Sequence, residues 1–224
     1  MKPLFKSVIF DLDGTLIDTI ADIALCMNKA LMLHGLPPVD EKAYKTLVGR
    51  GMKRLASSVM PPELQRSADA ETCAASLADD ALRFYKEAPV VHTTPYNGIR
   101  ELLAELKRRK LRTAVLSNKP DVMAHIVVHA LFPQGSFDVI RGEIDGKPSK
   151  PAPEPVWDIL VEIDSSPRDT VFLGDSEIDM ETARASGCHA VGAAWGFRSY
   201  ETLAKAGAER IIDTPLDFLE ILCV

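Results

Sequence analysis

Short apolar runs and amphipathic stretches follow one another along this chain in an order that changes twice. An apolar run at 8–10 leads directly into Asp11, which is the pattern of a strand buried on both faces. From 17 to about 87, apolar positions recur at helical spacing. The helical stretches are separated by turn-forming residues: Gly35, Pro37, Pro38, Gly49, Gly51, Pro61 and Pro62. This part of the chain therefore predicts helices without strands.

From residue 99 onward the pattern alternates between helix and strand. Amphipathic stretches lie between short apolar segments, which we predict to be strands: 112–116, 137–140, 170–173, 190–194 and 210–212. Alternation of this kind favours a parallel sheet with helices on both faces. We therefore predict an α/β protein with a Rossmann-like doubly wound core at 1–16 and 88–224, and a helical module inserted at 17–87.

The net charge and the apolar content of the chain argue against nucleic acid and membranes as binding partners. The chain of 224 residues has a net charge of -6, which argues against a general binder of nucleic acid or of anionic membranes. The basic run at 107–110 closes a predicted helix, where cations complement the helix dipole, so we interpret it as a solvated helix end. No apolar stretch approaches the roughly 20 residues that span a bilayer. We expect no nucleic-acid partner and no membrane partner.

The cysteines indicate a reducing compartment. Cys26, Cys73, Cys188 and Cys223 are scattered without CxxC spacing, and no charged and then apolar leader precedes the first strand. We therefore predict a cytoplasmic protein. The residues leave the oligomeric state open between a monomer and a homodimer.

Polar side chains follow three of the predicted strands. Asp11, Ser117 and Asp175 each come directly after, or just after, an apolar run. Because open parallel sheets bind ligands outside the carboxyl ends of their strands, we expect these side chains to converge. Asp13 lies two residues after Asp11, so both carboxylates point the same way if the chain stays extended. Such a pair repels, and a bound cation such as Mg²⁺ or a shared proton would relieve the repulsion.

Four motifs resemble those of the haloacid dehalogenase-like hydrolases, in the same order. The stretch Asp11-Leu-Asp-Gly-Thr-Leu16 resembles the first motif, and Ser117 in Leu-Ser-Asn resembles the second. Lys150 in Lys-Pro-Ala-Pro resembles the third, and 174–179, reading GDSEID, resembles the fourth. The resemblance covers nearly the whole chain. It implies a phosphatase that acts through an aspartyl-phosphate and requires Mg²⁺.

Each motif residue then has an expected role. Asp11 would attack phosphorus, because a covalent intermediate divides one hard hydrolysis into two displacements. Asp13 would protonate the leaving oxygen and then deprotonate water. The family implies Mg²⁺ ligation by the Asp11 carboxylate, the Asp13 backbone carbonyl and Asp175, with Asp179 as an outer carboxylate or weaker ligand.

The remaining candidates would contact the substrate. Lys150 would neutralise the phosphoryl oxygens, and Ser117 and Asn118 would donate hydrogen bonds to them. Thr15 adds a hydroxyl beside the acidic pair. In the helical insertion, Arg50 or Lys53 would meet an anionic substrate, although both also fit an ordinary helix break with exposed cations.

Several of these residues have simpler interpretations. Ser117-Asn118 also fits an ordinary turn, and Asp175 also fits a helix cap. Lys150 also fits a solvated loop lysine, with Lys147 as a rival for its role. His125 and His129 have the spacing of a zinc pair, but Ile126 stands where the HExxH motif needs its Glu, so zinc is disfavoured.

Differences between this sequence and the motifs of individual subfamilies indicate which subfamily it resembles. Asp13 disfavours the dehalogenases and the phosphonate-cleaving members, which lack this second Asp. Ile23 stands where the beta-phosphoglucomutases carry a cap His, which disfavours a mutase. The insertion after the first motif resembles the helical cap of the phosphoglycolate phosphatases, so we predict a small phosphate ester as substrate. Pyrophosphatase, nucleotidase and sugar-phosphate phosphatase or phosphomutase activities stay open, as does a phospho-Asp signalling module.

Overall fold

The computed structural model describes residues 5–222 and divides the chain into two compact units. One unit contains the described residues up to Asp18 and from Thr94 onward, and the other is Thr19–Thr93. The sequence pattern placed the insertion at 17–87. The return to the first unit comes later, because the Asp22 carboxylate holds the backbone of 91–93 against the start of the helical unit.

The first unit contains a parallel sheet of six strands in the order β5-β4-β1-β6-β7-β8. Its strands are β1 Ser7–Phe10, β4 Arg112–Pro120, β5 Val139–Glu143, β6 Thr170–Gly174, β7 His189–Ala193 and β8 Arg210–Ile212. Ser7 aligns with Arg112 on one side and with Thr170 on the other. β1 is therefore an interior strand, and its apolar side chains at 8–10 are fully buried.

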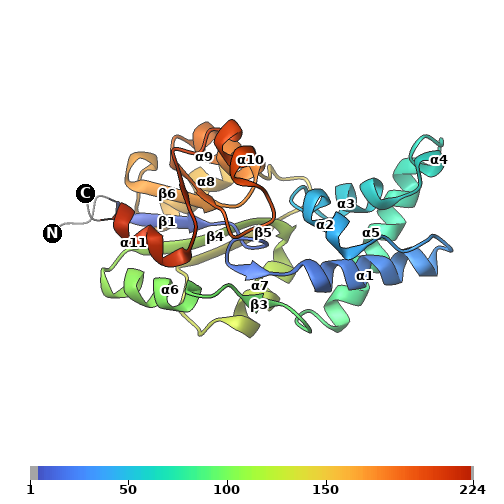
Figure 1. Cartoon of the computed structure of the whole chain (residues 1–224), viewed down its shortest axis with the longest axis horizontal. Coiled ribbons are helices and arrows are strands. Elements are labelled where there is room, and N and C mark those ends of the chain that lie inside the picture. The colour runs from blue at the N-terminus through green and yellow to red at the C-terminus, as the bar shows by residue number, and fades with distance from the viewer. Residues whose placement is uncertain (1–4, 223–224) are drawn as a thin grey trace. The chain divides into compact units, whose positions relative to one another are not determined.

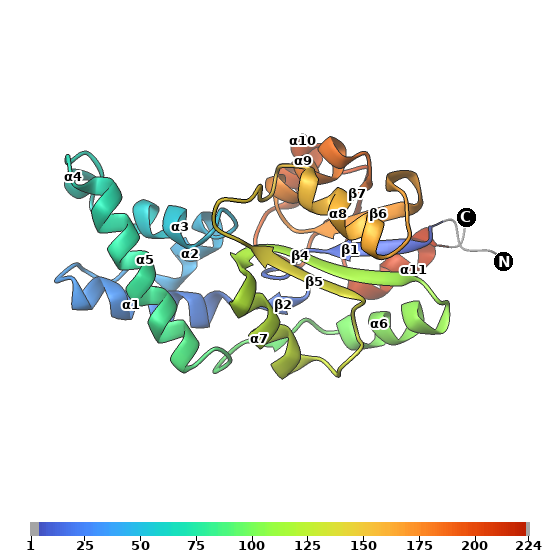
Figure 2. The same cartoon turned by 180° about the vertical axis from the view of Figure 1, so that it is seen from behind.

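Helices cover both faces of this sheet, as Figure 1 and Figure 2 show from opposite sides. The helices α6 Ile99–Arg108 and α7 Asp121–Leu131 lie on one face. The helices α8 Glu154–Glu162, α9 Glu177–Ser186 and α10 Tyr200–Ala206 lie on the other, where they enclose an apolar core around Ile9, Leu116 and Phe172. The predicted doubly wound α/β architecture is confirmed. The chain ends with the short helices η2 Pro215–Asp217 and α11 Phe218–Ile221.

The second unit is helical. It contains α1 Ile20–Leu33, α2 Glu41–Leu47, α3 Met52–Val59, α4 Pro62–Gln65 and α5 Ala70–Glu87. The helices α1 and α3 both pack on α5, with Met27, Leu55 and Leu77 among the buried side chains. The helical spacing of the sequence predicted these packing faces, whereas the four-residue α4 is too short to produce a periodic signal.

Three local features differ from the sequence-based prediction. β5 begins at Val139 rather than at 137, because the Asp138 carboxylate accepts a hydrogen bond from the Thr113 backbone. β4 continues to Pro120 and so includes 117–119. A separate antiparallel pair, β2 Ile17–Asp18 with β3 Thr94–Pro95, was not predicted, because its strands are two residues long and far apart in sequence.

The basic run ends a helix as predicted, since α6 ends at Arg108, and Arg108 and Arg109 both pair with Glu105. None of the helices within residues 5–222 combines the length and the hydropathy that a membrane span requires. Cys26, Cys73 and Cys188 are free thiols, while Cys223 lies outside the described residues. The cytoplasmic location stays a prediction.

Candidate active site

Asp11 lies at the carboxyl end of β1 and is held by the neighbouring strand. Its backbone N–H donates to Leu173 O of β6 at 2.9 Å. The Lys150 Nζ lies 2.6 Å from Asp11 Oδ1, and the side chain of Lys150 is only 3% exposed. The solvated-loop interpretation of Lys150 is therefore wrong, and its rival Lys147 is exposed.

Lys150 also bonds to the first turn of α9. Its Nζ lies 2.6 Å from Asp179 Oδ1, while Asp179 Oδ2 accepts from the Ser176 backbone N–H and hydroxyl at 3.0 and 2.6 Å. These contacts form a capping box at the N-terminus of α9. Burial alone would lower the pKa of Lys150, but the charges of Asp11 and Asp179 outweigh it and raise that pKa. Lys150 is therefore a buried permanent cation.

Three carboxylates converge beside Lys150. One oxygen each of Asp11, Asp175 and Asp179 lie within 4.8 Å of one another. Burial, and then the charge of Asp179, raises the pKa of Asp11 well above its usual value and that of Asp175 to about 7. A divalent cation would relieve this repulsion, and an all-oxygen donor set suits Mg²⁺. The residues therefore fit the predicted metal.

Glycines shape the space around Asp175. An added Cβ on Gly14, whose φ is +95°, would lie 2.4 Å from Asp175 Oδ2, and one on Gly196 would lie 2.2 Å from the Asp175 Cβ. Only backbones without side chains fit here. The Asp175 carboxylate accepts from Thr15 Oγ1 at 3.2 Å and from the Phe197 backbone N–H at 2.7 Å. These contacts fix its orientation.

The segment after β7 contributes to the site in a way that sequence reasoning missed. Besides the Gly196 and Phe197 contacts with Asp175, Trp195 donates its indole N–H to Thr15 O at 2.9 Å. The glycine beside two aromatic residues was a visible signal, but its contacts with the first motif depend on the pairing of distant strands.

A second buried ion pair lies next to the first and was also missed. Lys119 Nζ lies 2.9 Å from Asp13 Oδ1 and 3.0 Å from Asp13 Oδ2. Lys119 follows Ser117 by two residues at the end of β4, where the register with β5 is irregular. Regular strand alternation therefore could not predict this contact.

The predicted phosphate donors make protein contacts. Ser117 and Asn118 are buried. The Ser117 hydroxyl accepts from the Lys119 backbone N–H at 3.2 Å, and the Asn118 side chain donates to Lys150 O at 3.0 Å. Thr15 is buried with its hydroxyl on Asp175. Contacts of Ser117, Asn118 and Thr15 with substrate stay predictions.

The remaining candidates lie elsewhere. Arg50 is exposed in the helical unit between α2 and α3, and Lys53 pairs with Glu71 at 3.4 Å, so their substrate contacts also stay predictions. The rings of His125 and His129 have centroids 5.6 Å apart on α7. Within 5–222 the acidic triad is the sole group of three or more potential metal ligands, so these histidines do not form such a group.

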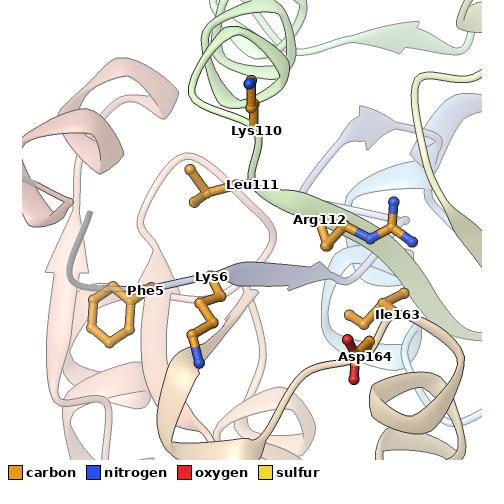
Figure 3. Close-up of a pocket in the computed structure, with 7 residues that line it drawn as sticks. All are labelled: Phe5, Lys6, Lys110, Leu111, Arg112, Ile163 and Asp164. Carbon is orange, nitrogen blue, oxygen red and sulfur yellow. The ribbon is translucent and has the colours of Figure 1, made fainter. Parts of the chain in front are cut away.

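A surface hollow lies at the amino ends of β1 and β4, the opposite edge of the sheet. Its volume is about 360 Å³, and Lys6, Arg112 and Asp164 are among its lining residues (Figure 3). Lys6 pairs with Asp169 at 2.6 Å and Arg112 with Asp138 at 2.7 Å, while the Lys110 side chain points away from Lys6. Lys6 and Arg112 thus have partners of their own, and none of the motif residues lines this hollow, so it is not the candidate active site.

The convergence of four motifs at one sheet edge agrees with comparisons to known proteins. Residues 8–193 match the family model of the haloacid dehalogenase-like hydrolases. The chain belongs to this family.

Individual relatives align over nearly the full length. The chain is 31% identical to the N-acetylmuramic acid 6-phosphate phosphatase of Pseudomonas aeruginosa, with 97% of this chain and 94% of the relative covered. It is 30% identical to the phosphoglycolate phosphatase of Chromobacterium violaceum, with coverages of 97% and 96%. A crystal structure from Lactobacillus delbrueckii subsp. bulgaricus, provisionally described as a phosphoglycolate phosphatase, superimposes with a TM-score of 0.89 at 31% identity and full coverage of both chains. The family match and the two relatives named as phosphatases support a phosphoric monoester hydrolase.

Proposed function

We propose that this protein is a Mg²⁺-dependent phosphatase that hydrolyses small phosphate monoesters through an aspartyl-phosphate. One observation carries the proposal: the buried Lys150 ammonium lies 2.6 Å from both Asp11 and Asp179, beside the Asp175 carboxylate. A carboxylate approaches an anionic phosphate only where fixed positive charge offsets the repulsion. Lys150 supplies such a charge at the carboxylate that the first motif offers as nucleophile.

The chemistry follows from these side chains. Asp11 attacks phosphorus, so an Oδ–P bond forms as the P–O bond to the alcohol breaks, and Asp13 gives the departing oxygen its proton. Asp13 then accepts a proton from water, which attacks the phosphorus and releases phosphate from Asp11. Lys150 balances the charge of the phosphoryl oxygens in both steps.

The carboxylates of Asp11 and Asp175 and the backbone carbonyl of Asp13 would hold Mg²⁺. The bound ion supplies positive charge to the phosphoryl oxygens. Asp179 is less suited to be a strong metal ligand, because its two oxygens already accept hydrogen bonds from Lys150 and Ser176. We therefore assign Asp179 to the orientation of Lys150.

The relatives suggest two substrates. Phosphoglycolate phosphatases recur among them, and the Pseudomonas aeruginosa enzyme that acts on N-acetylmuramic acid 6-phosphate is as similar. We propose 2-phosphoglycolate as the first candidate and this sugar phosphate as the second. The helical unit would serve as a cap that excludes water, with Arg50 as a candidate contact. Pyrophosphate, nucleotides and other sugar phosphates remain alternatives.

Phosphate release from a substrate panel tests the proposal. The panel contains 2-phosphoglycolate, N-acetylmuramic acid 6-phosphate, pyrophosphate, a nucleoside monophosphate and a hexose phosphate, each assayed with Mg²⁺ and with chelator. We expect turnover that requires Mg²⁺ and that falls by about 10³-fold or more in Asp11→Asn, whereas Asp145→Asn, an exposed loop residue, keeps full activity. Undiminished activity in Asp11→Asn would refute the mechanism. Accumulation of a stable phospho-Asp without turnover would instead favour the signalling alternative.

A further inference from the structure

Lys119 is the buried cation that the proposed mechanism leaves without a role. We propose that Lys119 is a positioning residue, which holds the Asp13 carboxylate where it can reach the leaving-group oxygen of the substrate. The inference rests on the proposed acid–base role of Asp13. It adds a residue outside the four motifs to the reaction.

The contact is close and enclosed. Lys119 Nζ lies 2.9 and 3.0 Å from the two oxygens of Asp13 and donates a hydrogen bond to Oδ2, so the ammonium lies close to both oxygens of the carboxylate. The Lys119 side chain is 3% exposed and that of Asp13 is 11% exposed. An ion pair shielded from water in this way keeps its geometry better than an exposed pair does.

The backbone on the Lys119 side is tightly packed. The Lys119 N–H donates to the Ser117 hydroxyl, and β4 pairs with β5 at Pro120 and Glu143. An added Cβ on Gly142 of β5 would lie 2.5 Å from Lys119 O. The strand therefore presents the ammonium from a rigid base.

The backbone on the Asp13 side is also held in place. Leu12 O accepts from the N–H groups of Thr15, Leu16 and Ile17, and the Gly14 N–H donates to Ile17 O at 2.8 Å. With this backbone fixed, the remaining freedom of Asp13 is the rotation of its own side chain. The two contacts with Lys119 restrict that rotation.

The two buried lysines therefore have separate partners. Lys150 bonds to Asp11 and Asp179, whereas Lys119 bonds to Asp13. A general acid or base works only within hydrogen-bond reach of the atom it serves. Loss of Lys119 should therefore impair proton transfer selectively, while the attack of Asp11 on phosphorus stays intact.

The dependence on the leaving group separates these two effects. An alkyl phosphate such as 2-phosphoglycolate expels a basic alkoxide and needs the proton, whereas p-nitrophenyl phosphate expels a stable phenolate without one. The ratio kcat/KM reports the steps up to departure of the alcohol. In Lys119→Met, we expect kcat/KM to fall by about 10²-fold for the alkyl substrate and by no more than about threefold for the aryl substrate.

The second step supplies an independent readout. Because Asp13 must also activate water, kcat for the aryl substrate should fall in Lys119→Met while its kcat/KM does not. An initial burst of nitrophenol should then appear. Lys119→Gln, which keeps an N–H donor, should show a smaller selective loss, and Lys205→Met on the exposed face of α10 should match the wild type.

The outcomes are distinguishable. If the wild-type protein releases no phosphate from any substrate, the proposed function fails. If the wild type is active but Lys119→Met and Lys119→Gln lose alkyl and aryl activity equally, Lys119 has only a structural role and the inference is overturned. It is overturned as well if neither activity falls.

Discussion

At the scale of single residues, the Asp175 carboxylate is held by backbone that leaves no room for a side chain. Gly14 and Gly196 approach it from two separate segments, and an added Cβ on Gly196 would also lie 2.5 Å from Gly14 O. Because the atoms that it meets include backbone, they cannot rotate away. A single methyl group at 196 should therefore displace Asp175 or the first motif.

We expect Gly196→Ala to lower activity by at least about tenfold and stability by about 1–3 kcal/mol, the usual cost of overpacking. The measurements are kcat/KM with Mg²⁺ and urea unfolding. Gly146→Ala is the matched control, because its φ of +76° imposes strain but no heavy atom lies within 4 Å of an added Cβ. This control should lose stability while it keeps activity. Normal activity in Gly196→Ala would show that the site tolerates the displacement.

At the scale of elements, α1 and the segment that follows α5 are joined by one buried carboxylate. Asp22 accepts hydrogen bonds from the backbone N–H groups of Val91, His92 and Thr93 and from the Thr93 hydroxyl, at 2.6–3.0 Å. Burial alone would raise the pKa of Asp22, but these hydrogen bonds lower it. The two ends of the helical unit are thereby joined to each other.

Asp22→Asn should destabilise the protein by about 2–4 kcal/mol, because an amide offers one acceptor oxygen in place of two and turns an N–H toward other donors. Amide exchange at 91–93 should become faster.

Since the folded pKa of Asp22 lies below its unfolded value of about 3.9, its stabilisation is present above that pH and is lost in stronger acid. The variant should therefore show less acid destabilisation than the wild type. Asp79→Asn, exposed on α5, is the control. Unchanged exchange at 91–93 in the Asn variant would contradict this role for Asp22.

At the scale of the whole molecule, the acidic cluster makes stability depend on divalent cations. The buried carboxylates of Asp11, Asp175 and Asp179 lie close together, and Lys150 is the cation that bonds to two of them. Any ion that binds the folded state alone stabilises it, by about 2.7 kcal/mol at a hundred times its Kd. Mg²⁺ should therefore raise the Tm, and chelator should reverse the shift.

The size of this shift should depend on pH. Because the pKa of Asp175 is raised to about 7, the metal-free protein takes up a proton there as the pH falls, which stabilises the folded state. Above pH 7 the metal-free protein carries the full repulsion, so Mg²⁺ should raise the Tm more at pH 8 than at pH 6. Asp175→Asn should abolish most of the difference. An equal shift at both pH values would rule out proton competition at this site.

The sequence by itself determined those features whose cause is local. Continuous apolar runs identified the buried strands, helical spacing identified the helical segment, and Asp11 and Asp175 stood out because acids follow apolar runs directly. The family motifs added Lys150, which the structure places against Asp11.

Only the tertiary structure decided which side chains meet. Lys119 and Asp13 are 106 residues apart, and Asp22 lies 69 to 71 residues before the amides it binds. Such contacts depend on strand order and on the path of the chain between strands, and no local period in the sequence reports either of them.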